Sequence, residues 1–505
     1  MSEAKNPSTL LELLEQTPGK NTAIIVPETG VSFTYDALRE QVSQTAGAFT
    51  AAGIRPDERI AIALPNGLPA VVSFLAASIA GTAAPLNPGY RFEEFSFYLD
   101  DTAARALVVP PEGMEEARKA AAAANIPILV AETGAQGAAQ ISGASPSGAV
   151  ERPSPDGVAL VLHTSGSTGR PKRVPLSHAR LAVSARNVAE TYDLTESDVS
   201  LCVMPLFHVH GLVASTLATL LTGGTLVVPA RFNALSFWRT IRECKVTWYS
   251  AVPTIHQLAL ARAAQRPQGI ESLRFIRSCS APLPVEIARK LEETIGVPVL
   301  EAYGMTEASH QMASNPLPPS PHKFGTVGPA TGIRIGVMDS AGALLPPGEL
   351  GEVVIRGASV IDGYENNPEA NATSFTDGWF RTGDQGTLDE EGYLRLTGRL
   401  KELINRGGEK ISPVEIDEVL LSHPAVAEAV AFAMPHPAWG EEVAAAVVLR
   451  HAAGETEIMD YCRSRLADFK CPKKLHVLET IPRTATGKIQ RRNVAAALTG
   501  SPAGQ

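Results

Sequence analysis

The sequence is poor in cysteine and has no paired cysteine spacing. Its 505 residues contain five cysteines, an odd number, and no two of them have CxxC spacing. A disulfide framework needs an even set in an oxidising compartment, and structural zinc sites use closely spaced pairs. We therefore expect reduced thiols, a cytoplasmic location and no zinc site.

The chain also lacks a long apolar run. The longest weakly apolar stretch, Pro69–Leu86, is rich in alanine and is interrupted by serine, glycine and proline. A bilayer span needs about 20 predominantly apolar residues, so a buried helix followed by a strand is the better interpretation. The start has no apolar core behind a basic leader, and the final SPAGQ is no SKL-type address. We expect neither a signal peptide nor a membrane partner.

Positive charge is in deficit. The chain has 44 lysines and arginines against 53 aspartates and glutamates, a formal net charge of -9. Phosphate backbones repel such a chain, which argues against a nucleic-acid partner. A local basic site for a small phosphate ligand is compatible with this balance.

The length and the order of the expected elements indicate an α/β protein with more than one core. A chain of this length exceeds one ordinary domain. Up to about residue 330, strand-like runs such as Arg59–Leu64 alternate with helical patterns such as Tyr35–Gly53, which predicts parallel sheets. Short strands with Gly and Pro turns follow, as in GELGEVVIRG, and predict a β-rich subdomain.

The last hundred residues predict a smaller α+β unit. The segment SPVEIDEVLLSHP predicts a helix with Ser412 as N-cap, Pro413 at its first position and Glu415 closing a capping box. VAEAVAFAMP and EVAAAVVLR predict strands. A Lys/Arg-rich loop, PRTATGKIQRR, follows near the end.

A loop rich in glycine and hydroxyl groups follows the apolar strand VALVLH. Its backbone N–H groups, hydroxyl donors and one ammonium suit a triphosphate, although a Walker A pattern is absent. An ordinary surface loop is the competing interpretation. The candidate binding residues are Thr164, Ser165, Gly166, Ser167, Thr168, Gly169 and Lys172.

Three further motifs carry groups that suit a nucleotide. The segment EAYGMTE offers an aromatic ring for adenine, a hydroxyl for phosphate and a carboxylate for Mg²⁺. The segment RTGD alone favours a tight turn, although Asp384 could accept both ribose hydroxyls. Lys488 follows a glycine in the basic tail and could reach a reacting phosphate, whereas a solvated tail is the simpler interpretation.

Together and in this order, the four motifs resemble those of the adenylate-forming superfamily of acyl-CoA synthetases, luciferases and peptide-synthetase adenylation domains. The resemblance spans about residues 8–495. It implies a large N-terminal domain (1–398), a hinge (399–401) containing Lys401, and a mobile C-terminal domain (402–505). It also implies ATP, Mg²⁺ and coenzyme A as reaction partners. One departure is Arg173, because the superfamily usually has glycine after the loop lysine; we expect activity to survive it.

The resemblance implies a role for each matching residue. Glu307 is the expected Mg²⁺ ligand, and Lys488 is the lysine that contacts the substrate carboxylate and the α-phosphate region. Thr306 and Glu307 join Lys488 in the implied catalytic set. Gly407 and Gly408 match the loop that the pantetheine thiol approaches. The implied nucleotide-binding set adds to the glycine-rich loop the residues Ser280, Ala281, Pro282, Glu301, Ala302, Tyr303 (adenine), Gly304, Thr306 (phosphate), Asp384 and Arg399 (ribose), and Lys488.

The expected acyl pocket is polar. Fatty and aromatic acid synthetases usually have apolar or small residues where this chain has His210, Ser280 and His310, whereas His208 matches a gating position found across the superfamily. Buried polar groups against hydrocarbon stay unpaired, so the three favour a short, polar, possibly dianionic acid. A second carboxylate would also favour a protonated histidine. His208 and His210 are two residues apart, as metal ligands on a strand can be, but no further ligand is evident.

Several segments, among them PLFHVHGL, RFIRSCSAPL and LEAYGMTEASHQMASNPLP, resemble the oxalyl-CoA synthetases of plants and fungi more narrowly. Oxalate, the smallest dicarboxylate, fits the polar pocket. Three alternatives stay open: a ligase for malonate or a short or medium-chain monocarboxylate, transfer to a carrier protein in place of free coenzyme A, and a non-catalytic nucleotide-binding protein.

Overall fold

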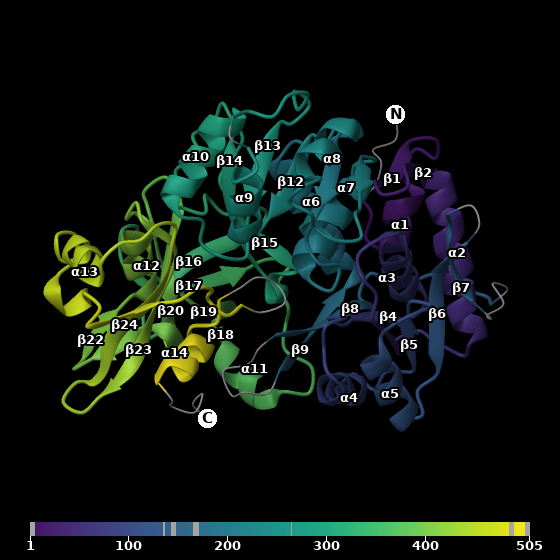
Figure 1. Cartoon of the computed structure of the whole chain (residues 1–505). Coiled ribbons are helices and arrows are strands. Elements are labelled where there is room, and N and C mark those ends of the chain that lie inside the picture. Colours follow the sequence, from purple (N-terminus) through teal and green to yellow (C-terminus); the bar gives the residue numbers. More distant parts are fainter. Residues whose placement is uncertain are drawn as a thin grey trace.

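The structure is a computed structural model of the whole chain, shown in Figure 1. It describes residues 6–134, 137–142, 148–164, 171–263, 265–483 and 489–499. Four sheets are built from these residues. In the same residues, no helix is both long enough and apolar enough to cross a membrane.

A seven-stranded, mostly parallel sheet has the order β7-β6-β5-β3-β4-β8-β9. Only its two edge pairs, β6 with β7 and β8 with β9, are antiparallel. Its strands are β3 (Arg59–Ile62), β4 (Thr82–Pro85), β5 (Ala106–Val109), β6 (Ile128–Thr133), β7 (Ala139–Ser142), β8 (Val158–Thr164) and β9 (Lys172–Ser177). The helices between its strands are α3 (Leu68–Ala80), α4 (Phe92–Asp101) and α5 (Glu115–Ala123).

The eight-stranded sheet has the order β15-β14-β13-β12-β10-β11-β1-β2, with parallel pairing from β14 to β1. Its strands are β1 (Thr22–Val26), β2 (Val31–Thr34), β10 (Val199–Cys202), β11 (Thr225–Val227), β12 (Trp248–Ala251), β13 (Phe275–Ser278), β14 (Val299–Met305) and β15 (His310–Ser314). The accompanying helices are α1 (Leu10–Glu15), α2 (Tyr35–Ala51), α6 (His178–Thr191), the π-helix η1 (His210–Leu217), α7 (Ala218–Leu221), α8 (Phe237–Glu243), α9 (Pro253–Leu260) and α10 (Val285–Ile295).

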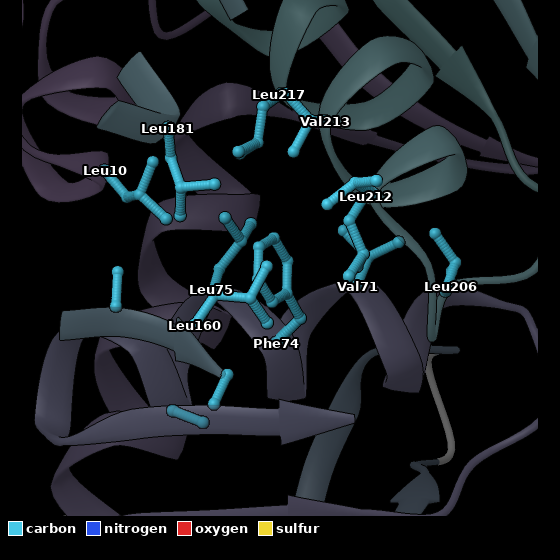
Figure 2. Close-up of a cluster of buried hydrophobic side chains, with 14 of the residues drawn as sticks. Leu10, Val71, Phe74, Leu75, Leu160, Leu181, Leu206, Leu212, Val213 and Leu217 are labelled. Atoms are coloured by element: carbon cyan, nitrogen blue, oxygen red, sulfur yellow. The ribbon is translucent and has the colours of Figure 1, made fainter. Parts of the chain in front are cut away.

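Helix α3 is the apolar centre of the largest core. Every residue of α3 except Pro69 is buried, which confirms the predicted buried helix followed by a strand. Figure 2 shows why: Val71, Phe74 and Leu75 of α3 face leucines and a valine of η1, and Leu10 and Leu181 pack alongside. A helix that is apolar on all sides needs such cover on all sides. The core therefore holds η1, which begins at His210, against α3.

An antiparallel sheet follows, as predicted for the β-rich subdomain. Its order is β16-β17-β19-β18, with β20 also paired to β19. The elements are β16 (Arg334–Met338), β17 (Gly351–Arg356), α11 (Pro368–Ser374), β18 (Phe375–Thr376), β19 (Trp379–Leu388) and β20 (Leu394–Arg399). The RTGD segment lies inside β19 and is not a tight turn, because β17 pairs it on one side and β20 on the other.

The C-terminal elements form a fourth sheet with its own core of buried side chains. They gather at the yellow end of the molecule, opposite the blue strands of the seven-stranded sheet (Figure 1). They are β21 (Ile404–Arg406), β22 (Glu409–Ile411), α12 (Pro413–Leu421), β23 (Val426–His436), β24 (Gly440–Leu449), α13 (Glu455–Arg463), β25 (Lys474–Val477) and α14 (Arg491–Thr499). The α/β class with a small α+β unit is thus confirmed.

The start of α12 confirms one predicted cap and corrects another. The Ser412 hydroxyl accepts a hydrogen bond from the Glu415 N–H at 3.4 Å, as an N-cap does. The Glu415 carboxylate does not close a capping box. Its oxygens instead accept two hydrogen bonds of 2.8 Å from the Lys470 ammonium, which is a stronger, charge-assisted partner than a backbone N–H.

Candidate active site

Several candidate residues lie just beyond the carboxyl ends of three parallel strands. The loop after β10 leads to His210, the first residue of η1. Ser280, Ala281 and Pro282 follow β13. Strand β14 itself carries Glu301, Ala302, Tyr303 and Gly304, and the short helix η2 (Thr306–Ala308) continues it with Thr306 and Glu307. Parallel strands bring their carboxyl ends to one edge of a sheet, which is where α/β proteins bind ligands.

Tyr303, Asp384 and Arg399, which were assigned to the nucleotide from the sequence, form one cluster. The Tyr303 hydroxyl donates a short hydrogen bond to the Asp384 carboxylate. Arg399 Nε lies 2.9 Å from the other carboxylate oxygen, and Asp384 and Arg399 are direct cross-strand partners. Burial and the neighbouring Asp384 raise the pKa of Tyr303 well above its usual value, so the ring keeps its hydroxyl proton. Within this cluster the negative charge of Asp384 is paired with the positive charge of Arg399.

Glu307 is buried and held by two hydroxyl groups. Thr164 Oγ1 donates to its Oε1 at 3.1 Å, and Tyr364 Oη donates to the same oxygen at 2.9 Å. Burial and the Glu307 carboxylate raise the pKa of Tyr364, which therefore remains a donor. Among the described residues no group of three or more His, Cys, Asp or Glu could hold a metal. A single carboxylate still fits Mg²⁺, which is usually completed by water and substrate phosphates.

The two ends of the glycine-rich loop lie side by side. Thr164 and Lys172 are direct partners in the antiparallel β8–β9 pair. The Lys172 ammonium lies 4.4 Å from the centre of the Tyr364 ring. Ser165, Gly166, Ser167, Thr168 and Gly169 lie outside the described residues.

Lys401, in the short helix η3 (Leu400–Glu402), faces the same region. Burial and the nearby charges of Arg399, Arg492 and Lys172 lower its pKa. The structure therefore brings the expected hinge lysine within electrostatic reach of the expected phosphate loop.

Arg173, which departs from the superfamily pattern, makes structural contacts. Its guanidinium donates a short hydrogen bond to the Asp101 carbonyl, and its Nε lies 3.3 Å from the Asp101 carboxylate. A second carboxylate, of Glu365, is 3.9 Å away. Arg173 thereby ties β9 to the end of α4.

The expected acyl-pocket residues form a hydrogen-bonded group. His210 Nδ1 lies 3.0 Å from Ser280 Oγ, and His210 Nε2 lies 2.6 Å from Ser250 Oγ. The rings of His210 and His310 pack edge to face, with their centroids 5.3 Å apart. His208 stands apart on the half-buried turn before η1, against the Phe207 ring. The two histidines therefore do not share a strand face.

Two pocket residues have unusual backbone conformations. Ser280 has φ 75° and His310 has φ 137°, both in the region that favours glycine. Strained backbone that the surrounding structure holds in place is concentrated at functional sites. Gly304 explains how His310 fits: a Cβ there would lie 2.3 Å from the His310 carbonyl oxygen and 2.5 Å from its Nδ1. The glycine of the EAYGMTE motif thus makes room for the pocket histidine.

The candidate coenzyme A residues lie in the C-terminal unit. Gly407 and Gly408 turn the chain between β21 and β22, with φ 58° and 101°. A Cβ at Gly407 would lie 2.7 Å from the Trp439 ring, so a larger residue would collide with it. Lys488 lies outside the described residues.

Sequence reasoning missed three residues that touch these groups. Tyr364 holds Glu307, Ser250 holds His210, and Arg277 donates to Ser250 at 2.8 Å. Arg277 lies in the segment RFIRSCSAPL but was assigned no role there, and each of the three residues meets its partner across a long sequence separation. A buried arginine in the apolar strand RFIRS was the one available signal.

The chain is similar to known CoA ligases over nearly its whole length. The oxalate–CoA ligase of Arabidopsis thaliana is 47% identical to this chain, over 92% of this chain and 93% of that protein. The oxalate–CoA ligase of Saccharomyces cerevisiae is 43% identical, over 94% of each. The crystal structure of ATP-bound MatB from Rhodopseudomonas palustris superposes with a TM-score of 0.89 and 29% identity, covering 97% of this chain and 99% of that one.

Two family models match the two parts of the chain. The AMP-binding enzyme model matches residues 12–365, and the model of the AMP-binding enzyme C-terminal domain matches residues 415–488. The first covers well over half of the sequence and includes Tyr303, Glu307 and the acyl-pocket residues, whereas Asp384 and Arg399 lie beyond its end. The chain therefore belongs to the AMP-binding enzyme family.

Proposed function

We propose that this protein is an oxalate–CoA ligase. In the first half-reaction an oxalate oxygen attacks the α-phosphorus of ATP, and the products are oxalyl-AMP and pyrophosphate. In the second, the coenzyme A thiol gives up its proton, attacks the acyl carbon and displaces AMP, and the product is oxalyl-CoA. The observation that carries the choice of acid is the polar pocket of His210, Ser280 and His310.

The enzyme class rests on family membership and on the relatives. The chain is an AMP-forming acid–thiol ligase that uses ATP, Mg²⁺ and coenzyme A. Its alignment with CoA ligases runs over more than nine-tenths of both chains.

The pocket supports a short dicarboxylate over a fatty or aromatic acid. The imidazole of His210 and the ring of His310 are buried, and Ser280 is half-buried beside them. A hydrocarbon chain placed there would face the Ser280 hydroxyl and leave its hydrogen without an acceptor, at a cost of roughly 1–3 kcal/mol. Oxalate has acceptor oxygens on both carbons and can satisfy this donor without a long cavity.

Residue roles are part of the proposal. Glu307 would hold Mg²⁺, which would neutralise the phosphates during the displacement. Tyr303 would lie against adenine, Asp384 and Arg399 would hold the ribose, and Lys488 would stabilise charge at the reacting phosphate. No protein nucleophile is needed, because catalysis consists of positioning and charge stabilisation.

The domain division and the location also belong to the proposal. Residues 399–401 would act as the hinge on which the C-terminal unit turns between the half-reactions, with Gly407 and Gly408 presented to the thiol. All five cysteines are free thiols, which supports a cytoplasmic location.

The test is pyrophosphate release by the purified protein with ATP, Mg²⁺ and coenzyme A. The acids are oxalate, malonate, acetate, octanoate and 4-coumarate. Strong turnover with oxalate alone is the expected result. Turnover only with another acid would keep the enzyme class and overturn the choice of oxalate. No turnover with any acid would favour a carrier-protein acceptor or a non-catalytic role.

A further inference from the structure

A buried arginine behind the pocket residues has no carboxylate partner among the described residues. Arg277 lies on β13 and is 0% exposed. Its Nε donates to Tyr192 Oη at 2.9 Å, its Nη1 to Ser250 Oγ at 2.8 Å and its Nη2 to Gln311 Oε1 at 2.9 Å. All of these acceptors are neutral. Arg274, three residues earlier, pairs with the Asp198 carboxylate at 2.6 Å instead.

An unbalanced buried charge is costly, so its persistence needs a reason. Buried charges in proteins are normally paired, because hydrogen bonds to neutral groups replace only part of the lost hydration. The hydrogen bonds around Arg277 lead from it toward the pocket. They connect it, through Ser250, to His210 and then to Ser280.

The direction of this chain of hydrogen bonds is fixed by its first member. A guanidinium only donates, so Ser250 accepts from Arg277. Arg277 Nη1 also points an N–H at His210 Nε2, at 3.5 Å. With donors facing it, Nε2 is the accepting nitrogen of a neutral imidazole, and the ring hydrogen is on Nδ1.

The hydrogen bonds therefore run from Arg277 to Ser250, from Ser250 to His210, and from His210 Nδ1 to Ser280. Ser280 Oγ accepts from the imidazole, which leaves its own hydrogen for an acceptor in the pocket. A carboxylate only accepts hydrogen bonds, whereas an amide also presents donors. The oriented chain thus suits a carboxylate at this place better than its neutral amide.

We propose that Arg277 selects a dianionic acid by providing the positive charge opposite the substrate's distal carboxylate, and that it acts through Ser250, His210 and Ser280. The proposal rests on the proposed oxalate function and adds the source of its specificity. Arg277 is a positioning residue here, because its contacts are with other side chains.

The test compares oxalate with oxamate, in which a neutral amide replaces the distal carboxylate. Steady-state kcat and KM are measured for both acids with the full chain, ATP, Mg²⁺ and coenzyme A. Wild-type enzyme should prefer oxalate. Arg277→Met should lower kcat/KM for oxalate by about 10- to 100-fold and that for oxamate by less than about 3-fold, the range expected for a lost charged partner. The loss should fall mainly on KM, because the distal carboxylate does not react.

Two smaller changes keep the test decisive if Arg277→Met does not fold. Ser250→Ala should remove the hydrogen bonds that connect Arg277 to His210 while keeping the Arg277 charge. It should reduce the preference for oxalate over oxamate by about 10-fold. Arg277→Lys should restore part of the preference relative to Arg277→Met. The matched control is Ser200→Ala, a buried serine on the neighbouring strand β10 whose hydroxyl has no hydrogen-bond partner in the described structure. This control should leave the preference unchanged.

The possible results distinguish an error in the role of Arg277 from an error in the proposed function. An unchanged oxalate-to-oxamate ratio in folded Ser250→Ala and Arg277→Lys, with wild type active on oxalate, would overturn the role of Arg277 alone. An equal loss for both acids would assign Arg277 a purely structural role and would also overturn it. Wild-type enzyme inactive on oxalate but active on another acid would overturn the proposed function itself.

Discussion

The two halves of the candidate site handle charge in opposite ways. In the nucleotide cluster, Asp384 pairs with Arg399 at 2.9 Å and also accepts from Tyr303. In the acyl pocket, Arg277 is buried against neutral groups. The first arrangement is electrostatically complete without a ligand, whereas the second is completed only by an incoming anion. Nucleotide affinity and acid selectivity should therefore respond to different substitutions.

The largest effect is expected at Lys488, which would contact both the substrate carboxylate and the reacting phosphate. Lys488→Ala should slow oxalyl-adenylate formation by on the order of 10²–10³-fold, because a positioned charge at the reacting phosphate is lost. Thiolation of preformed oxalyl-adenylate should be largely spared. Pyrophosphate release and oxalyl-CoA formation from the adenylate measure the two steps separately. Lys473→Ala, which removes a lysine paired with Asp468, is the control. Equal loss of both steps would contradict the assignment.

A loss confined to the acid side is expected from the pocket histidines. His310→Ala and His210→Ala should each lower kcat/KM for oxalate by about 100-fold, because His310 is a polar group of the acid pocket and His210 orients the Ser280 hydroxyl toward the substrate. ATP binding, measured by calorimetry, should be retained. His322→Ala is the matched control, since that ring pairs with Glu292 outside the pocket. Full oxalate activity in both pocket variants would remove them from the acyl site.

A loss confined to the nucleotide side is expected from Asp384→Asn. The change keeps the shape but removes the charge that Arg399 faces, so the KM for ATP should rise by about 10-fold. The ratio of oxalate to malonate turnover should not change, which is the signature of a site separate from acid selection. A shift in that ratio would show that the two halves are coupled.

The smallest effect is on stability and depends on pH. Burial raises the pKa of Glu301 from 4.5 to about 7, although the Leu283 N–H opposes the shift. The protonated form is favoured in the folded protein, so this contribution to stability is full below pH 4.5 and disappears as the pH rises through 7. Glu301→Gln should therefore raise the free energy of unfolding by up to about 3 kcal/mol at pH 8 and by little at pH 5. Denaturant titration at both pH values measures this; an equal change at both would exclude the buried carboxyl as the cause.

The parts that could be predicted from the sequence are those whose residues are contiguous. The EAYGMTE and RTGD segments include parts of β14 and β19, and the Tyr303 hydroxyl of the first donates to the Asp384 carboxylate of the second. Local rules also predicted the buried helix α3 and the Ser412 cap. The Glu415 capping box failed because Lys470, 55 residues away, offers a charged partner that a local rule cannot include.

The acyl pocket was only half predictable for the same reason. His210, Ser280 and His310 were identified from motif positions, and the structure brings the first two within 3.0 Å. Ser250 and Arg277 lie on adjacent strands and become neighbours only through parallel register, in which Ser250 is the direct partner of Arg277. Strand pairing over 27 residues cannot be read from local patterns, so the charge behind the pocket was missed.

The most direct test of the account is a competition between two dicarboxylates. Oxalate and malonate at equal concentration, with ATP, Mg²⁺ and limiting coenzyme A, yield thioesters whose ratio, measured by mass spectrometry, equals the ratio of the two kcat/KM values. We expect oxalyl-CoA to exceed malonyl-CoA by at least about 10-fold, a difference of roughly 1.4 kcal/mol. Equal amounts, or an excess of malonyl-CoA, would contradict it.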